Sequence, residues 1–397
     1  MKITISVLGR FHLFHLARQL QDQGLLARLI TSYPKFETVK YGIKPENITS
    51  LLIHEIHNRV WRKISPFTES FFNPQYMIFE LFDRHAALQL CAPGDIFVGL
   101  SGSALHSLRA ARRAGAKTVL ERGSTHMLFQ RKILTDEYRR FGLEKEVVHP
   151  LVVDRELREY QEADYISVPS QFVKGTFLQY GIPEAKLIQI PYGVNLQHFY
   201  PIPKADKTFR VIHCANLSLR KGVPYLLQAF SELRLKDAEL WLIGSITDEV
   251  KPFLRRFASP AIKLKGQFPE NELYKYMSQG SVFCLASIEE GLAMVQPMAM
   301  ACGLPVICTA NTGGADIVRE GRDGFILPIR DVEAIKEKIL YFYEHPEACR
   351  TMGASARKRV QAGYSWADYA RKMIAAYENI LRPEAAVTRR QQPVRLA

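Results

Sequence analysis

Short apolar runs rich in β-branched residues recur along the chain, with amphipathic segments between them. The runs are, in chain order, ITISVL, DIFVGL, TVLERG, YISVPS, FRVIHCANL, ELWLIGS, SVFCLAS, PVICTA and GFILP. The segments HLFHLARQLQDQG, ALHSLRAARRAG, QFVKGTFLQYG and PYLLQAFSEL have the spacing of helices that bury one face. Strands that alternate with helices predict parallel sheets covered on both faces. Because one sheet of so many strands is improbable at this length, we predict an α/β fold of two doubly wound, Rossmann-like domains.

The segment from residue 190 to residue 210, IPYGVNLQHFYPIPKADKTFR, separates the two predicted domains. It contains three prolines and a glycine, and a new strand pattern begins at Phe209. We therefore expect an N-terminal domain in residues 1–195 and a second domain in residues 196–365. For residues 366–397 we expect most of the amphipathic helix YSWADYARKMIAAYENIL and a basic tail that frays.

Composition and charge narrow the class of protein. With 47% hydrophobic and 23% charged residues, the 397-residue chain has the composition of a globular protein. Its formal net charge of +13 favours an anionic partner, which could be nucleic acid, a phosphorylated substrate or a membrane surface. Since no nucleic-acid-binding motif accompanies the charge, we expect no nucleic-acid partner.

The cysteines and the N-terminus favour a cytoplasmic protein. The six cysteines form no CxxC pair, and no histidine lies at a spacing typical of a zinc site. Cys284 and Cys302 lie within apolar runs, so we expect buried thiols in a reducing compartment. The N-terminal stretch lacks a cleavage pattern of small residues, and no run of about 18 apolar residues occurs. We therefore expect neither a signal peptide nor a membrane span.

Residues 57–82 combine cationic and aromatic side chains. The set is Arg59, Arg62 and Lys63, interleaved with Trp61, Phe67, Phe71, Phe72 and Tyr76. Two interpretations stay open for this segment. It could contact an anionic membrane surface, or its aromatic side chains could pack on the N-terminal core.

Polar side chains and glycines follow several predicted strands, which is where open α/β sheets bind ligands. They are Gly9 and His12, on either side of Phe11; Ser124, Thr125 and His126; Arg220, Lys221 and Gly222; Glu289, Glu290 and Gly291; and Asn311, Thr312, Gly313 and Gly314. Arginine and lysine suit a diphosphate, and carboxylates suit hydroxyl groups. A ligand with both phosphate and polyol character, such as a nucleotide sugar, would engage all of these groups. Gly9 stands alone without a GxGxxG pattern, so a nicotinamide cofactor is only weakly indicated.

Each of these residues also has a simpler interpretation. Arg220 and Lys221 could be surface charges, and His126 could be a hydrogen-bonded histidine of the core. We expect Glu289 to be solvated, and the glycines could all be turn glycines. If residues 291–293 begin a helix, their amide groups would favour a bound phosphate.

Five motifs in chain order resemble those of the retaining family 4 glycosyltransferases, which have the GT-B fold. IPYGVNLQHFYP is similar to IPNGVDxxxFxP, and NLSLRKGVPYLLQAF is similar to GRLxxEKGxxxLIxAF. ASIEEGLAMVQPMAMACGLPVICTANTGGADIV resembles PSxxEGFGLxxLEAMACGxPVVAxxxGGxxEIV, while GRDGFILPIRDVEAI and YSWADYARKMIAAYENIL resemble the closing motifs. The resemblance covers most of residues 160–380 and is weaker in the N-terminal half. It implies two Rossmann-like domains across a cleft, with residues 1–195 on the acceptor side, residues 196–365 on the nucleotide-sugar side, and a final helix that returns to the first domain.

The resemblance also implies roles for individual residues. Glu290 takes the place of the first glutamate of the E-x7-E motif, which touches the donor sugar; Lys221 matches the lysine that binds the diphosphate; and His126 matches the histidine that faces the sugar. We expect these three to be catalytic. The expected donor-binding residues are Gly9, Asn216, Arg220, Gly291, Leu292, Ala293, Met294 and Met298, and Phe11 and His12 are expected on the acceptor side. Because no DxD motif occurs, we expect no metal and no cofactor.

Two departures from the family pattern predict rearranged nucleotide contacts. Met298 stands where the family has the second glutamate of E-x7-E, which usually holds the ribose hydroxyls. A thioether cannot accept two good hydrogen bonds. Asn216 replaces the arginine of GRL, and Arg220 could supply the missing charge. In the hinge motif, Tyr192 and Asn195 replace the family's asparagine and aspartate.

These patterns favour a retaining glycosyltransferase that moves a sugar from a nucleotide-sugar donor to a glycan or lipid-linked acceptor. We expect it in surface polysaccharide or glycolipid biosynthesis, in the cytoplasm and in peripheral contact with the inner face of the membrane. Two other classes stay open: a non-catalytic GT-B protein that binds sugars or partners, which Met298 favours, and a nucleotide-sugar epimerase of the same fold.

Overall fold

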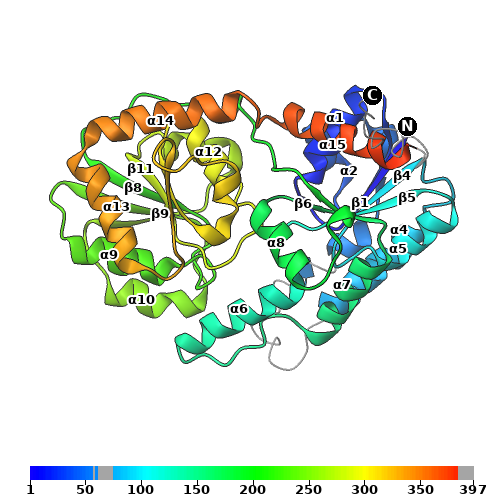
Figure 1. Ribbon diagram of the computed structural model, residues 1–397, viewed down its shortest axis with the longest axis horizontal. Helices are drawn as coiled ribbons and strands as arrows, with labels where there is room; N and C mark the ends of the chain where they lie inside the picture. Colours follow the sequence, from blue (N-terminus) through cyan, green and yellow to red (C-terminus); the bar gives the residue numbers. More distant parts are fainter. Residues whose placement is uncertain (57–58, 61–74, 383–397) are drawn as a thin grey trace, which may run out of the picture. The chain divides into compact units, whose positions relative to one another are not determined.

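The protein forms two compact units, each built on parallel strands covered by helices. The structure, a computed structural model, describes residues 1–56, 59–60 and 75–382 (Figure 1). The first unit comprises the described parts of Met1–Glu121, Arg158–Ile166 and Ala370–Ala397. The second comprises Arg122–Leu157 and Ser167–Tyr369.

The first sheet has seven strands in the order β3-β2-β1-β4-β5-β6-β7. Their bounds are β1 Ile3–Val7, β2 Leu26–Thr31, β3 Ile48–Ser50, β4 Ile96–Leu100, β5 Lys117–Glu121, β6 Tyr165–Val168 and β7 Leu187–Gln189. Strand β1 runs parallel to both β2 and β4, and all five of its residues are buried. A strand that is buried on both faces explains why ITISV reads as a continuous apolar run broken only by small hydroxyl residues.

The second sheet has six parallel strands in the order β10-β9-β8-β11-β12-β13. Their bounds are β8 Phe209–Cys214, β9 Ala238–Ile243, β10 Ile262–Gly266, β11 Val282–Leu285, β12 Val306–Thr309 and β13 Gly324–Leu327. Strand β8 pairs with β9 on one side and with β11 on the other. The strand order therefore reverses between β8 and β11, which makes their carboxyl ends the expected ligand site of this sheet.

The helices cover the faces of the two sheets (Figure 1). In the first part of the chain they are α1 Leu13–Asp22, α2 Lys35–Thr38, α4 Gln75–Leu88, α5 Leu105–Arg113, α6 Met127–Arg140, α7 Pro150–Glu162 and α8 Gln171–Gln179. The later helices are α9 Val223–Leu233, α10 Lys251–Arg256, α11 Leu273–Met277, α12 Val295–Ala301, α13 Val332–Glu344, α14 Pro346–Gln361 and α15 Trp366–Leu381. Helices α9 and α13 share one apolar core with strands β8, β9 and β11 of the second sheet.

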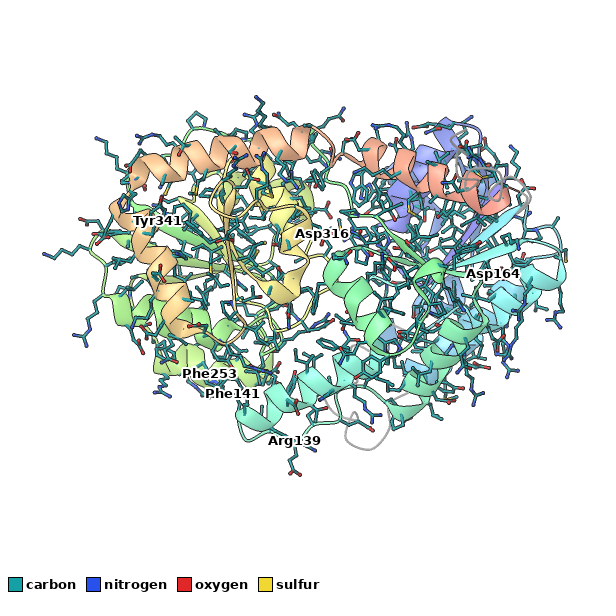
Figure 2. The ribbon with its side chains drawn as sticks, viewed as in Figure 1. Arg139, Phe141, Asp164, Phe253, Asp316 and Tyr341 are labelled. Carbon is teal, nitrogen blue, oxygen red and sulfur yellow. The ribbon has the colours of Figure 1, made fainter. Side chains whose placement is uncertain are left out.

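Helix α6 packs within the second unit, although its sequence precedes the second sheet by about seventy residues. The ring of Phe141, which follows the helix, meets Phe253 of α10 edge to face, with 5.0 Å between the ring centroids (Figure 2). The buried carboxylate of Glu137 accepts hydrogen bonds from Tyr225 at 2.8 Å and from Arg330 at 2.6 Å. The segment Arg122–Leu157 thus brings residues that follow β5 into the unit that contains the second sheet.

The predicted α/β architecture is confirmed, and every apolar run taken as a strand contains one. The remaining four strands lack the signal of a long apolar run, for reasons that differ between them. Strand β10 alternates partly buried and exposed residues, strand β7 has no buried residue, and strand β3 is only three residues long. Strand β2 is largely buried, but it begins four residues after the end of helix α1, so its apolar residues continue the pattern of the helix.

Two sequence-based expectations fall largely outside the described residues. The aromatic and cationic segment 57–82 coincides with α4 only from Gln75 onward, and the basic tail VTRRQQPVRLA lies beyond residue 382. In the part of the chain that the structure describes, none of the helices is both long enough and apolar enough to cross a membrane. All six cysteines are described as free thiols, and Cys284 and Cys302 are buried as expected.

Candidate active site at the carboxyl edge of the second sheet

The loops that follow β8 and β11 lie against each other. The backbone N–H of Ile288 donates to the carbonyl oxygen of Arg220 at 2.8 Å, and the N–H of Glu290 donates to the carbonyl oxygen of Asn311 at 2.9 Å. The amide of Asn311 donates in turn to the carbonyl oxygen of Ile288 at 3.0 Å. These bonds hold the loops after β8, β11 and β12 together at one edge of the sheet.

Lys221 and Glu290 form an ion pair at this edge. The Nζ of Lys221 contacts Oε1 of Glu290, and the hydroxyl of Ser287 donates to the same oxygen at 3.2 Å. The side chains are 20% and 10% exposed, so water still reaches the pair. The structure therefore brings together the lysine and the glutamate to which the resemblance gives donor-binding roles.

Arg220 and Glu289 form a second ion pair beside the first. The Nη2 of Arg220 lies 2.8 Å from Oε2 of Glu289, and its Nε donates to the carbonyl oxygen of Glu289 at 3.1 Å. Nη2 also donates to the hydroxyl of Ser124 at 3.1 Å. These contacts hold the guanidinium in one orientation, and within the described residues its Nη1 has no hydrogen-bond partner.

Glu289 is fully buried, so the expectation that it is solvated is wrong. Its Oε1 accepts from the hydroxyl of Thr125 at 2.6 Å and from that of Ser124 at 2.9 Å, and its Oε2 accepts from Gln130 at 3.2 Å. Burial by itself would raise the pKa of Glu289, but the charge of Arg220 and the hydrogen bonds from Thr125 and Ser124 outweigh it and lower the pKa to about 2. The carboxylate stays charged and ties the segment after β5 to the segment after β11.

The sequence contains a signal for this arrangement. The dipeptide Arg220-Lys221 after one strand and the dipeptide Glu289-Glu290 after its neighbour can pair side by side, because parallel strands bring their carboxyl ends together. The hydroxyls of Ser124 and Thr125 and the amide of Gln130 carried no such signal, because they come from a segment far away in the sequence.

His126 is buried at the start of helix α6, with 3% of its surface exposed. Its Nδ1 accepts the N–H of Leu128 at 3.3 Å, and its ring stacks on Tyr180 with centroids 4.5 Å apart. Burial, together with the charge of Arg122, lowers the pKa of His126 to about 4. The neutral ring caps α6. In the sequence, His126 follows Ser124 by two residues, and the hydroxyl of Ser124 contacts both Glu289 and Arg220.

Gly291 and its neighbours are arranged by close backbone contacts and not by a helix start. Helix α12 begins at Val295, and the N–H of Ala293 donates to the carbonyl oxygen of Thr312 at 3.2 Å. The condition that residues 291–293 begin a helix is therefore not met, and the amide of Ala293 already has a partner. A Cβ on Gly291 would lie 1.9 Å from the carbonyl oxygen of Gly123, so only glycine fits there.

The other expected donor-binding residues differ in exposure. Asn216 is exposed, and its side-chain oxygen accepts from the hydroxyl of Ser245. Leu292 is buried and Met294 is half-buried. Met298 is 5% exposed in the middle of α12, where a thioether packs well and a carboxylate would need partners.

Gly9, Phe11 and His12 belong to the first compact unit and not to the unit of the two ion pairs. Gly9 has a φ of +82°, and its N–H donates to the hydroxyl of Ser32 at 2.9 Å. Phe11 is exposed, whereas His12 is buried and its Nε2 lies 2.9 Å from Glu121. The structure therefore groups Arg220, Lys221, Glu290 and His126 in one unit and these three residues in the other.

His213 was not singled out in the sequence, although it lies on β8 beside the site. It is fully buried, and its Nδ1 contacts the carbonyl oxygen of Cys284 at 3.0 Å, which makes Nδ1 the protonated nitrogen. Burial lowers its pKa to about 4, and it interacts electrostatically with both Lys221 and Glu290. Among the described residues, no group of three or more His, Cys, Asp and Glu side chains is placed to hold a metal ion.

Fold and site together define a two-unit α/β protein with paired charges at the switch point of its second sheet. The family model "Glycosyltransferase Family 4" matches residues 10–198, and the model "Glycosyl transferases group 1" matches residues 197–359. The two matches adjoin and span most of the chain. The chain belongs to the family 4 glycosyltransferases, as the resemblance predicted.

Individual relatives and structures agree with the family. The chain is 27% identical over 229 residues to a GDP-mannose-dependent α-(1-6)-phosphatidylinositol monomannoside mannosyltransferase of Mycolicibacterium smegmatis, covering 52% of this chain and 59% of that protein. It is 28% identical over 182 residues to the putative glycosyltransferase EpsD of Bacillus subtilis, covering 42% and 48%. The chain thus spans about half the length of the curated relatives it matches.

Solved structures establish the fold. Sucrose-phosphate synthase from Thermosynechococcus elongatus superposes with a TM-score of 0.73 at 19% identity, covering 96% of this chain and 99% of that one. Anabaena HepE in complex with UDP superposes with a TM-score of 0.70 at 15% identity, covering 96% and 100%. The predicted GT-B fold is confirmed.

Proposed function

We propose that the protein is a retaining glycosyltransferase that transfers a sugar from a nucleotide-sugar donor to a glycan or lipid-linked acceptor. The observation that carries this proposal is the presence of two adjacent ion pairs at the carboxyl edge of the second sheet, Arg220–Glu289 and Lys221–Glu290. Two cations and the carboxylate of Glu290 lie together at this edge, and groups of this kind suit a diphosphate and sugar hydroxyls, which supports the proposal. HepE, a structural neighbour, is described in complex with UDP-glucose, which agrees with a donor of this chemical class.

In the proposed reaction the bond between the sugar carbon and the diphosphate oxygen breaks, and a bond from the same carbon to the acceptor oxygen forms. Lys221 and Arg220 stabilise the negative charge that develops on the departing diphosphate. The acceptor hydroxyl attacks from the face that the diphosphate leaves, and its proton passes to the departing phosphate. Glu290 holds the donor sugar by its hydroxyls, and the protein cations take the place of a metal ion in this scheme.

We further propose that the pathway is the assembly of a surface polysaccharide or glycolipid, with peripheral contact at the inner face of the membrane. The net charge of +13 supports an anionic surface as a partner. The phosphatidylinositol mannoside named for the Mycolicibacterium smegmatis relative supports a lipid-linked acceptor.

Screening with nucleotide sugars tests the proposal. Thermal unfolding of the full chain is measured with UDP-, GDP-, ADP- and dTDP-sugars, because a ligand that binds only the folded state raises Tm. The donors that raise Tm are then incubated with glycan and lipid-linked acceptors, and the anomeric configuration of any product is read by NMR. A product with the donor's anomeric configuration supports a retaining transferase, and an inverted product contradicts the proposed mechanism.

Met298 supports one second candidate, a non-catalytic protein that binds sugars or partners. Its buried thioether replaces a carboxylate of the family pattern within α12. Glycan binding without transfer or hydrolysis of any donor in the same screen would favour this candidate.

A further inference from the structure

The two ion pairs at the edge of the second sheet differ in how easily they can open. Glu289 is fully buried and accepts hydrogen bonds from Ser124, Thr125 and Gln130 in addition to Arg220. Glu290 uses a single oxygen, Oε1, for both Lys221 and Ser287, and its Oε2 has no hydrogen-bond partner within the described residues. Glu290 can therefore exchange partners, whereas Glu289 is fixed.

A phosphate that binds Lys221 must compete with Glu290 for the same ammonium group. Separating the pair would leave the carboxylate of Glu290, whose side chain is 10% exposed, without its counter-ion, which costs free energy. A phosphate nearby adds a like charge and increases that cost. Hydroxyl groups that donate to the released carboxylate would offset it, because hydrogen bonds to a charged acceptor are strong.

The charged and titratable neighbours of the pair do not relieve this competition. The charge of Arg220 is matched by Glu289 at 2.8 Å. His213 on β8 is held neutral by burial, with its Nδ1–H directed to the carbonyl oxygen of Cys284. The two cations and two carboxylates therefore sum to zero before a ligand arrives.

We propose that the Lys221–Glu290 pair acts as an internal competitor that favours the intact nucleotide sugar over the free nucleoside diphosphate. An intact donor supplies the phosphate that takes Lys221 and the hydroxyls that take Glu290. A nucleoside diphosphate, which is the product, supplies only the phosphate, so Glu290 returns to Lys221 and weakens its binding. This inference rests on the proposed function and adds a means by which the site releases its product.

Calorimetric titration of the full chain with UDP, GDP, ADP, dTDP and their sugar conjugates tests the inference. In Glu290→Gln the competitor is neutral, so the affinity for the nucleoside diphosphate should rise about tenfold, which corresponds to about 1.4 kcal/mol. The affinity for the nucleotide sugar should not rise with it, because the neutral amide is a weaker acceptor for the sugar hydroxyls. The ratio between the two affinities should therefore fall.

Glu270→Gln is the matched control, because Glu270 is exposed and its substitution removes the same single charge. It should change neither affinity by more than about twofold at physiological salt. If Glu290→Gln folds but binds the nucleoside diphosphate no more tightly than the unsubstituted chain does, the inference is overturned. Sugar transfer by the unsubstituted chain would in that case still support the proposed function. Failure of every nucleotide and nucleotide sugar to bind the unsubstituted chain and the variant overturns both. If Glu290→Gln does not fold, the same two affinities are measured for Glu290→Ala, which also removes the competing charge.

Discussion

The residues of the candidate site carry opposite charges in equal number, and their burial decides what each can do. Lys221 and Glu290 are partly exposed and can turn to a ligand, while Glu289 is enclosed by hydroxyl and amide donors. A carboxylate enclosed in this way belongs to the scaffold of the site. The adjacent residues Glu289 and Glu290 thus have different roles despite identical chemistry.

Removal of either member of the Lys221–Glu290 pair should reduce transfer without unfolding the protein. We expect Lys221→Ala and Glu290→Ala each to lower the transfer rate by roughly tenfold to a thousandfold, the scale of losing one preorganised contact. Initial rates with the donor found in the screen measure the effect. Lys236→Ala, at an exposed lysine of the same unit, is the control and should retain full activity. Near-normal turnover in either site variant would show that the pair does not contact the reacting groups.

Removal of the buried carboxylate should act on stability. In Glu289→Ala, Arg220 loses its counter-ion and the hydroxyls of Ser124 and Thr125 lose their acceptor. Because Arg220 is 34% exposed and can be rehydrated in part, we expect a loss of about 2–3 kcal/mol in the free energy of unfolding. Urea denaturation measures it, and Glu270→Ala should change it by less than about 0.5 kcal/mol. A loss in Glu289→Ala as small as in this control would contradict the structural role.

Position 298 tests whether the family's second carboxylate can be restored. Since Met298 is buried, Met298→Glu should lower Tm in the absence of ligand, whereas Met298→Gln should lower it less because no charge is buried. If the position faces the ribose, a nucleoside diphosphate should restore more of the Tm of the glutamate variant than of the glutamine variant. Equal restoration in both variants would show that the position does not meet the nucleotide.

At the scale of helices and strands, the sequence predicted the elements that depend on the periodicity of apolar residues. It did not predict the side-chain burial that depends on contacts between distant segments. The buried strands β1, β8, β11 and β12 read as apolar runs because both of their faces are covered. The pairing of Lys221 with Glu290 could be expected from adjacent parallel strands. The burial of Glu289 could not, because it depends on Ser124, Thr125 and Gln130, whose place in space is set by how α6 packs in the second unit.

Gly222 joins the loop after β8 to helix α9 and leaves no room for a side chain. Its φ is +66°, and a Cβ would lie 1.8 Å from the carbonyl oxygen of Ala286. We expect Gly222→Ala to lower the free energy of unfolding by about 2–4 kcal/mol, from backbone strain and from the clash. Gly363→Ala is the matched control, since its Cβ would meet no atom within 4 Å. Equal stability of the two variants in urea would contradict this account.

At the scale of the whole molecule, two buried histidines make stability depend on pH. The pKa values of His126 and His213 are lowered to about 4, mainly by burial, whereas an unfolded histidine has a pKa near 6.5. Between these values the unfolded chain binds more protons than the folded one, so the free energy of unfolding rises with pH. The contribution is complete above about pH 6.5, and it is lost as pH falls from about 6.5 towards 4 by up to about 1.4 kcal/mol per pH unit for each histidine.

Thermal unfolding between pH 4.5 and pH 7.5 checks this dependence. Tm should fall as pH decreases, and His126→Asn, which keeps a side chain able to cap α6, should make the fall shallower. His198→Asn, at an exposed histidine, is the control and should leave the slope unchanged. An identical slope in His126→Asn and in the unsubstituted chain would show that His126 is not held neutral.

The parallel pairing of Arg220-Lys221 with Glu289-Glu290 also constrains how the two loops can change in length. Each dipeptide sits a fixed number of residues beyond its strand, and the hydrogen bond from Ile288 to Arg220 fixes one loop against the other. Inserting or deleting one residue between β8 and Arg220 would bring each cation opposite the wrong carboxylate or opposite none. One such insertion or deletion would break both ion pairs. A change of the same length between β11 and Glu289 could restore both. Length variation in these two loops should therefore occur jointly, while each remains free to vary in the residues that neither pair uses.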